Sequence, residues 1–546
     1  MTAPVLSKSG PYESTVRPGR DGFGRLLRAE WTKFRTVRGW VVAMVLAALL
    51  TPGIALLYHG QCGTVSPQGQ SIGCPASPLG PNGSAVTDAF YFAHQTLTGD
   101  ATVTARVTSL TGQYSPSGGF AGSGNPVGGF TRGVQPWSKA GIMIKASTAP
   151  GSAYAALLVT GSNGVRMQWN FTGDTAGMAG AVSLSAPRWL RLVRAGDTVT
   201  GYDSSDGTHW NLVNRVTLSG FPSAAQAGLF ATSPQHTVTR TSFGGSSSTG
   251  GPSLATGTFD NVNLTGAPGG GPAGGSWTGT HVGSGNTGGD LSGPGSTVFD
   301  GKFSQSAGVF TVTGSGDIAP DVPEAPDGNG STAQNALTGL VAGLIAVIIV
   351  AALFITAEYR RGLIRLTFAA SPRRGQVLAA KAVVIGAVSF VVGAAGAAVA
   401  LPLGEHQIQA GGYWLLPLPT SAEVQMIVGV GAMLAVAAVL ALALGTILRR
   451  GVSAVTTVIV VIFLPFLLGT LQGLLPLGAQ EWVMRVTPAA GFAVLQELPA
   501  YHQVVAQYTP ASGYFPLAPW TGFAVLCAWA GAALLAADYL LRRRDV

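Results

Sequence analysis

The order of apolar and polar positions divides the chain into two kinds of sequence. Residues 1–58 and 336–546 contain long apolar runs, whereas 59–333 are rich in Gly, Ser, Thr and Asn. A bilayer needs about 20 apolar residues for each spanning helix. The runs that qualify are 40–58, 336–357, 382–403, 424–448, 452–475 and 519–541. We therefore predict a membrane α-helical fold of six transmembrane helices, with one large domain inserted between the first and second.

The inserted segment has the pattern of an all-β domain. Between residues 88 and 264, short alternating runs are separated by Gly, Asn, Ser and Asp, as strands are by turns. The runs are Ala101–Leu110, Ala140–Ala146, Tyr154–Thr160, Val165–Asn170, Trp189–Arg194, Thr198–Asp203, Trp210–Val216 and Ala227–Ala231. Many short strands with regular turns favour a jelly-roll or related β-sandwich.

Composition and charge support a membrane protein. Only 10% of the residues are charged, and the mean hydropathy is +0.36, which indicates lipid as a solvent. A net charge of +8 is compatible with nucleic-acid binding. The Lys and Arg residues, however, gather at the ends of the apolar runs, as topology signals do. We therefore expect membrane lipid, and no nucleic acid, among the partners.

The same basic clusters predict an orientation. Lys and Arg are frequent in 1–39 and 358–381 and recur after residues 448 and 541, whereas loop 404–423 has none and loop 476–518 has only Arg485. Because basic loops stay inside, both termini are predicted to be cytoplasmic and 59–333 extracellular. An alternative is that the first run is a cleaved signal peptide, since a basic segment precedes it.

The chain has three cysteines. Cys527 falls in the last apolar run and is expected to pack there. Cys62 and Cys74 lie in the predicted extracellular segment, where an oxidising environment favours a disulfide between them. A zinc pair is less favoured, because the nearest histidines, His59 and His94, form no zinc-ligand spacing. No metal site is predicted.

Two segments on the predicted cytoplasmic side carry candidate functional residues. Residues 23–38 form an amphipathic helix that we expect to lie in the membrane interface. Residues 358–381 combine a short polar helix, a Pro-Arg-Arg-Gly break and a returning helix. The alternative for both is that the basic residues only anchor the chain and set its topology. The candidate residues are Arg28, Glu30, Trp31, Lys33 and Arg35 in the first segment, and Glu358, Tyr359, Arg360, Arg361, Gly362 and Arg365 in the second.

These segments resemble permeases of the type-2 ABC exporter family, of the kind common in high-GC Gram-positive bacteria. The similar stretches are Leu-Arg-Ala-Glu-Trp-Thr-Lys-Phe-Arg-Thr-Val-Arg at 27–38, Glu-Tyr-Arg-Arg-Gly-Leu-Ile-Arg-Leu-Thr at 358–367 and Arg-Val-Thr-Pro-Ala-Ala-Gly-Phe-Ala at 485–493. The resemblance implies an interface helix and a coupling segment that dock on an ABC ATPase subunit. It also implies a second permease copy or a sister permease, and a re-entrant helical hairpin within 476–518.

The chain lacks the sequence of a nucleotide-binding domain. A phosphate-binding Gly-x-x-x-x-Gly-Lys-Ser/Thr motif does not occur. We therefore expect no catalytic residues and no cofactor in this chain, with ATP and Mg²⁺ bound by the partner subunit. The apolar membrane segments favour an amphiphilic substrate.

The inserted domain resembles concanavalin A-like (laminin-G-like) β-sandwich domains. The similar stretches include Pro-Trp-Ser-Lys-Ala-Gly-Ile-Met-Ile-Lys at 136–145 and Trp-Leu-Arg-Leu-Val-Arg at 189–194. A stretch that opens such domains, Gly-Val-Phe-Thr-Val-Thr-Gly-Ser-Gly-Asp-Ile, occurs here at 308–318 instead. We infer a circular permutation in which 275–318 supplies the first strands, and we expect 308–318 to pair with the chain that begins near Asp88.

Exposed aromatic residues are the candidate binding residues of this domain. Trp137, Trp169, Tyr202 and Trp210 are candidate glycan contacts, although such residues more often pack in or beside a core. Glycosidase activity is disfavoured, because Asp203 and Asp206 lie in a turn-forming sequence and no acid pair is recognisable. The alternative function for the whole protein is a membrane-anchored surface carbohydrate-binding or sensor protein, but six helices exceed what anchoring needs.

Overall fold

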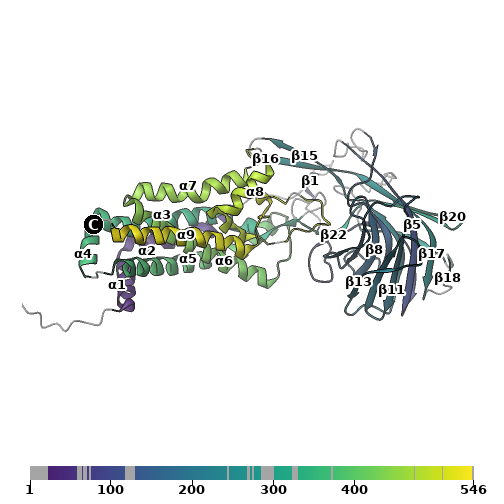
Figure 1. Cartoon of the computed structure of the whole chain (residues 1–546), viewed down its shortest axis with the longest axis horizontal. Coiled ribbons are helices and arrows are strands. Elements are labelled where there is room, and N and C mark those ends of the chain that lie inside the picture. Colours follow the sequence, from purple (N-terminus) through teal and green to yellow (C-terminus); the bar gives the residue numbers. More distant parts are fainter. Residues whose placement is uncertain are drawn as a thin grey trace, which may run out of the picture.

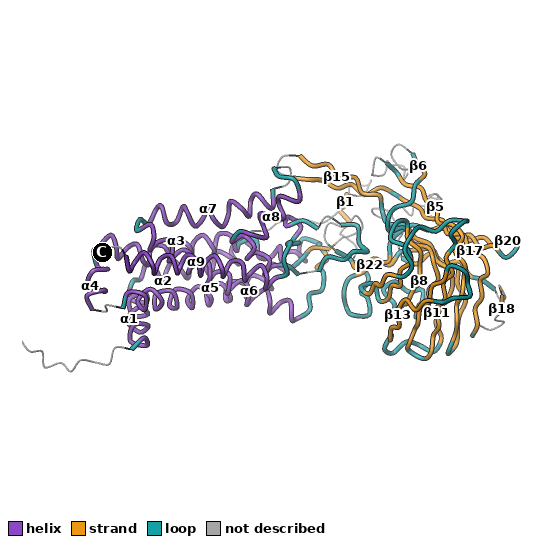
Figure 2. The backbone as a smooth tube through the Cα atoms, viewed as in Figure 1, coloured by secondary structure: helices purple, strands orange, loops and turns teal. Residues whose placement is uncertain are grey.

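In the computed structural model, a bundle of long helices and a β-sandwich lie at opposite ends of an elongated molecule (Figure 1). Figure 2 shows that helices make up the bundle and strands the sandwich, with loops between them. The structure describes residues 22–57, 64–65, 71–72, 76–116, 129–242, 245–266, 271–272, 276–283, 301–322, 330–370, 373–471, 474–497, 499–506 and 508–543. The predicted disulfide partners Cys62 and Cys74 lie outside these residues.

Six helices are long and apolar enough to cross a membrane, which confirms the prediction. They are α2 (Arg38–Ala55), α3 (Leu340–Arg360), α5 (Arg374–Ala410), α6 (Thr420–Leu448), α7 (Gly451–Thr470) and α9 (Pro519–Arg543). Short helices flank them: α1 (Phe23–Thr36), α4 (Leu363–Ala370) and α8 (Leu477–Val486). The elbow between α3 and α5 is therefore helical, as expected, and neither α8 nor the buried 3₁₀ segment Pro488–Leu495 spans the bundle.

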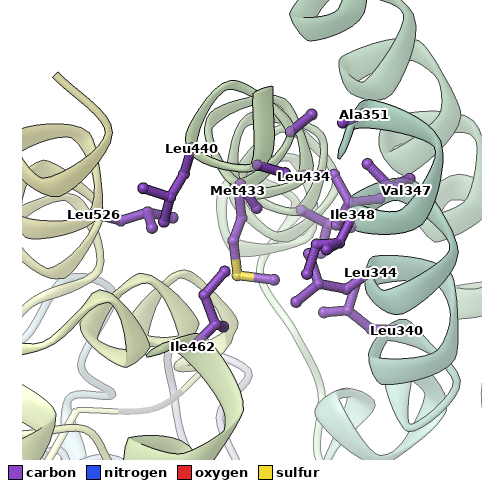
Figure 3. Packing of buried hydrophobic residues seen from close by; sticks show 14 of the residues in the cluster. Leu340, Leu344, Val347, Ile348, Ala351, Met433, Leu434, Leu440, Ile462 and Leu526 are labelled. Carbon is purple, nitrogen blue, oxygen red and sulfur yellow. The ribbon is translucent and has the colours of Figure 1, made fainter. Parts of the chain in front are cut away.

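Helix α6 lies at the centre of the bundle and contacts α3, α5, α7 and α9. Its side chains Met433 and Leu434 face α3 and α7, and Leu440 faces Leu526 of α9 (Figure 3). More than half of the apolar window of α6 is buried, compared with 22% for α7 and for α9. A helix that is apolar on all sides and buried on most of them is the core of a membrane bundle, while its neighbours keep lipid-facing sides.

The core of the inserted domain is formed by two facing antiparallel sheets, and two-stranded pairs such as β3 (Val86–Asp88) with β22 (Ile318–Pro320) lie outside them. The first has the order β10-β9-β8-β7-β14-β4-β19 and the second the order β13-β12-β11-β5-β17-β21-β20. All eight runs predicted from alternation are strands. The first sheet comprises β4 (Phe90–Thr98), β7 (Lys139–Lys145), β8 (Tyr154–Thr160), β9 (Val165–Trp169), β10 (Gly173–Ala176), β14 (Ala224–Thr232) and β19 (Thr278–Val282), and the second comprises β5 (Ala101–Tyr114), β11 (Arg188–Ala195), β12 (Thr198–Ser204), β13 (Asn211–Thr217), β17 (Ser253–Thr265), β20 (Lys302–Ser306) and β21 (Val309–Gly314).

Residues after 275 contribute strands to both sheets, as the permuted arrangement requires. Strand β19 forms the edge of the first sheet beside β4, and β21 pairs with β17 in the second. The expected pairing of 308–318 is confirmed at its last residue, since Ile318 pairs with Asp88. Strand β21 itself pairs with β17 and β20 and not with β4, because β19 and β14 already flank β4. The chain next to Asp88 is instead β22 (Ile318–Pro320), which pairs antiparallel with β3 (Val86–Asp88).

Two buried ion pairs hold β3 and the residues next to β22 against the sandwich. Lys139 Nζ lies 2.6 Å from Asp317 Oδ1 and also donates to the carbonyl of Ile318 at 2.6 Å. Lys145 Nζ donates to Asp88 Oδ2 at 2.7 Å. Both lysine side chains are completely buried. Strands β3 and β22 thereby cover the outer face of the first sheet, where a second apolar core forms.

The sandwich also contacts a loop of the membrane part. Val504 and Tyr514 of loop 496–518 pack in one cluster with Ala319 and Val322, which follow β22. The Gln503 side chain, itself buried, donates to the carbonyl of Phe171 at 3.3 Å. The sandwich is therefore attached by the two ends of its insertion and by this third contact.

The placement of β19 to β22 makes a prediction for isolated fragments. Fragment 60–330 should fold, whereas 60–264 should aggregate. Without β19 and β21, the edges of β4 and β17 are unpaired, and core side chains such as Phe259 lose the cover of Phe310 and Val312. Size-exclusion chromatography and circular dichroism of both fragments check this. A monomeric 60–264 fragment with cooperative unfolding would show that the later strands are dispensable.

Candidate functional site

The end of the bundle away from the sandwich includes α1, the start of α2, the end of α3, α4, the start of α5 and the end of α9 (Figure 1). Val37 lies between α1 and α2 and has an extended ψ of 91°, so the two helices are not continuous. Helix α1 therefore turns away from α2 and packs on α5. Phe34 is buried, and its ring packs on those of Trp40 and Phe354. The distances between the ring centres are 6.2 and 6.0 Å. An aromatic cluster thus fixes α1 to the bundle.

Beside this cluster, four charged side chains from three helices form one network. Lys381 of α5 donates to Glu30 Oε2 of α1 and to Glu358 Oε1 of α3, both at 2.7 Å. Lys33 donates to Glu30 Oε1 at 2.8 Å and to Glu358 Oε1 at 3.3 Å. Each lysine thus bridges the same two carboxylates. We refer to Glu30, Lys33, Glu358 and Lys381 as the charge network.

The inner part of the charge network is shielded from water and the outer part is not. The Lys381 side chain is 0% exposed, and its ammonium lies 4.6 Å from the centre of the Phe354 ring. Lys33 is 40% exposed. Burial lowers the pKa of Lys33, but the hydrogen bond to Glu30 and the charge of Glu358 outweigh it, so the net shift is upward. The two acids and two bases balance in charge, as a buried ionic group requires.

The predicted coupling residues divide into inward-facing and outward-facing sets. The carboxylate of Glu358 is engaged within the chain, and Tyr359 is half-buried beneath the guanidinium of Arg449, 5.4 Å from the ring centre. Among the predicted coupling residues, the side chains of Arg360, Arg361 and Arg365 are exposed and available to another subunit. Gly362 has a φ of +67°, a conformation that glycine adopts without strain and that here reverses the chain between α3 and α4.

The interface-helix residues divide in the same way. Glu30 faces the bundle, whereas Arg28 and Arg35 are exposed on the other side of α1. Trp31 is 46% exposed and stacks against Phe34 at 6.2 Å. Lys381 is the member of the charge network that was not among the candidates identified from the sequence. It lies just before an apolar run, where a lysine ordinarily indicates only which end of the helix is cytoplasmic.

The four candidate glycan contacts do not form one site. Trp137 is buried beside the guanidinium of Arg166, and Trp169 packs on the core from the first sheet. Tyr202 lies on the second sheet in β12, and Trp210 follows β12, beneath the guanidinium of Arg191 at 3.7 Å. Trp137 and Trp169 therefore lie with the first sheet, whereas Tyr202 and Trp210 lie with the second.

Comparisons with known proteins give one family match. The sequence model of the ABC-2 family transporter proteins matches residues 202–546, well over half of the chain. No curated protein matches significantly. Solved structures with low similarity include a functionally unknown protein from Saccharomyces cerevisiae (14% identity, 38% of this chain and 84% of that one, TM-score 0.20) and scytalido-glutamic peptidase with a transition state analog inhibitor (12%, 41% and 98%, TM-score 0.24). Because the family match includes five of the six long apolar helices, we conclude that this multi-pass membrane protein belongs to the ABC-2 transporter family.

Proposed function

We propose that the protein is the permease subunit of an ATP-driven exporter and that the charge network transmits the motion of an ATPase subunit to the membrane helices. The observation that carries this proposal is the pair of 2.7 Å contacts from Lys381 to Glu30 and Glu358. Through them, the outermost helix α1 is tied to two spanning helices. A displacement of α1 by a partner therefore moves α3 and α5 with it.

The surface around the charge network supplies the docking face. Arg28 and Arg35 on α1, with Arg360, Arg361 and Arg365 beside Gly362, are exposed at the same end of the bundle. Exposed arginines can form bidentate bonds with carboxylates of a partner. The partner we propose is an ABC ATPase subunit, which binds ATP and Mg²⁺ and docks here.

The remaining features of the proposed function concern topology, assembly and cargo. This end of the bundle is cytoplasmic in our proposal, because the basic residues of the chain concentrate there, and the sandwich is extracellular. The substrate path lies between this permease and a second copy or a sister permease. An amphiphilic cargo fits membrane helices whose faces are mainly Ala, Val, Leu and Gly.

For the sandwich we propose an extracellular role in contact with substrate, glycan or a partner protein. The outer face of its second sheet supports a polar ligand. There the register sets Thr111, Thr256, Thr313 and Lys302 side by side across β5, β17, β21 and β20. A membrane-anchored carbohydrate-binding protein is the second candidate function, and this row is the observation that favours it.

A charge-reversal experiment tests the docking face. Replacing Arg361 and Arg365 together by Glu should reduce recovery of the ATPase subunit with the permease at least about tenfold, since like charges then meet across the contact. Co-purification from the native membrane, with quantitative mass spectrometry, measures this. Arg485→Glu, at the opposite end of the bundle, is the control. Normal recovery and normal transport in the double variant would contradict the proposed docking face.

A further inference from the structure

A hollow of about 740 Å³ lies between the beginning of α5 and the end of α9. Its lining changes along the helix axes. Arg373, Arg374 and Arg542 line it where the two helices end, and Leu378, Leu534 and Leu535 line it one or more turns deeper. Leu535 is 74% exposed, on a helix that is apolar enough to cross a membrane. The hollow is thus polar at the helix ends and apolar at its deeper, lipid-facing part.

The polar part of the hollow has an excess of positive charge. Asp538 is the acidic residue in the lining of the hollow. The Asp538 carboxylate already forms an ion pair with Arg542, with 2.7 Å between Oδ2 and Nη2. Arg374 is held by its own contact, donating from Nη1 to the carbonyl of Leu541 at 2.6 Å. Arg373 is exposed and has no acidic partner among the residues that the structure describes. Three guanidinium groups therefore face one carboxylate.

We infer that this hollow binds an anionic phospholipid, with the phosphate between Arg373 and Arg542 and an acyl chain along Leu534 and Leu535. A lipid presents a charged headgroup and an apolar chain in the same order along the membrane normal as this lining does. Basic pockets between membrane helices attract anionic headgroups, and each Lys or Arg near the headgroup strengthens the attraction. The inference requires only that the helices lie in a membrane, so it stands apart from the proposed exporter function.

The binding experiment uses the full chain in mild detergent, titrated with dioleoylphosphatidylglycerol or dioleoylphosphatidylcholine and followed by native mass spectrometry. We expect the anionic lipid to bind about tenfold more tightly than the zwitterionic one. Arg373→Gln combined with Arg542→Gln should remove most of this difference. Arg360→Gln combined with Arg365→Gln removes the same charge at the same end of the bundle but outside the hollow, and should leave the preference intact.

Two further measurements separate a lipid from other anions. Leu535→Trp places an indole in the apolar part of the hollow and should reduce binding of the anionic lipid without changing the charge. Inorganic phosphate at millimolar concentration should not displace the lipid. Equal affinity for the two lipids, an unchanged preference in the double glutamine variant, or displacement by phosphate alone would each overturn the inference. Thermal unfolding of each variant verifies that the bundle is intact.

Discussion

Replacing Lys381 by Met is expected to prevent recovery of folded protein from the membrane. The substitution leaves the buried carboxylates of Glu30 and Glu358, each 2.7 Å from the Lys381 ammonium in the native protein, with Lys33 at the outer side of the network as their remaining cation. Removing one partner of a buried ion pair costs about 3–5 kcal/mol, a large share of the stability of most proteins. The fraction of monodisperse protein in detergent, measured by fluorescence-detection size-exclusion chromatography, should fall at least about tenfold.

Two companion variants distinguish the charge network from a general loss of packing. Lys33→Met should have a much smaller effect, below about 1 kcal/mol, because Lys33 is 40% exposed. The triple variant Glu30→Gln, Glu358→Gln, Lys381→Met removes all buried charge at this position and should recover most of the yield. If the triple variant folds but its ATPase partner no longer drives transport, the charge network serves coupling. Normal yield of Lys381→Met alone would refute its structural role.

The second large effect is expected in the sandwich. Asp317→Ala leaves the Lys139 ammonium completely buried, with the Ile318 carbonyl as its remaining partner. Unfolding of the sandwich should become easier by about 3–5 kcal/mol, which corresponds to a fall in its melting temperature of about 10 °C for a domain of this size. The change is measured on the full chain heated to a series of temperatures, with pulse proteolysis reporting the fraction of the sandwich that is unfolded at each temperature.

The surface pair Arg106–Asp260 provides a matched control for this prediction. Its side chains are 34% and 22% exposed, so Asp260→Ala should cost no more than about 1 kcal/mol. Lys139→Met combined with Asp317→Leu should restore part of the lost stability, since two apolar groups can replace a buried ion pair. Equal effects of Asp317→Ala and Asp260→Ala would mean that burial at Lys139 does not govern the stability of this segment.

The elements of the fold could be predicted from local patterns, but their charged contacts could not. Apolar length alone determines which helices can span a bilayer, and period-two alternation identified strands such as β5, in which Ala101, Val103, Ala105 and Val107 form the buried face. Glu30 and Lys381, by contrast, are 351 residues apart. No local sequence pattern relates them. Each lies in a basic segment beside an apolar run, and such segments ordinarily indicate only the cytoplasmic side of the membrane.

Alternation also fails where both faces of a strand are covered. Strands β7 and β8 are buried at every position, because the second sheet covers one face and segments around β3 and β22 cover the other. Lys139 and Lys145 at the ends of β7 would ordinarily indicate solvent. Their acidic partners lie far along the chain, so their burial becomes apparent only in the tertiary structure.

The antiparallel pairing of Ile318 with Asp88 has a consequence for the history of this protein. Paired strands lie about 4.8 Å apart, so the chain enters and leaves the sandwich at nearly the same point. A gene segment encoding such a domain can be spliced into a loop between two helices, or exchanged for another, without altering the distance that the loop must bridge. The helical bundle and the β-sandwich can in this way diversify independently, each retaining its own fold.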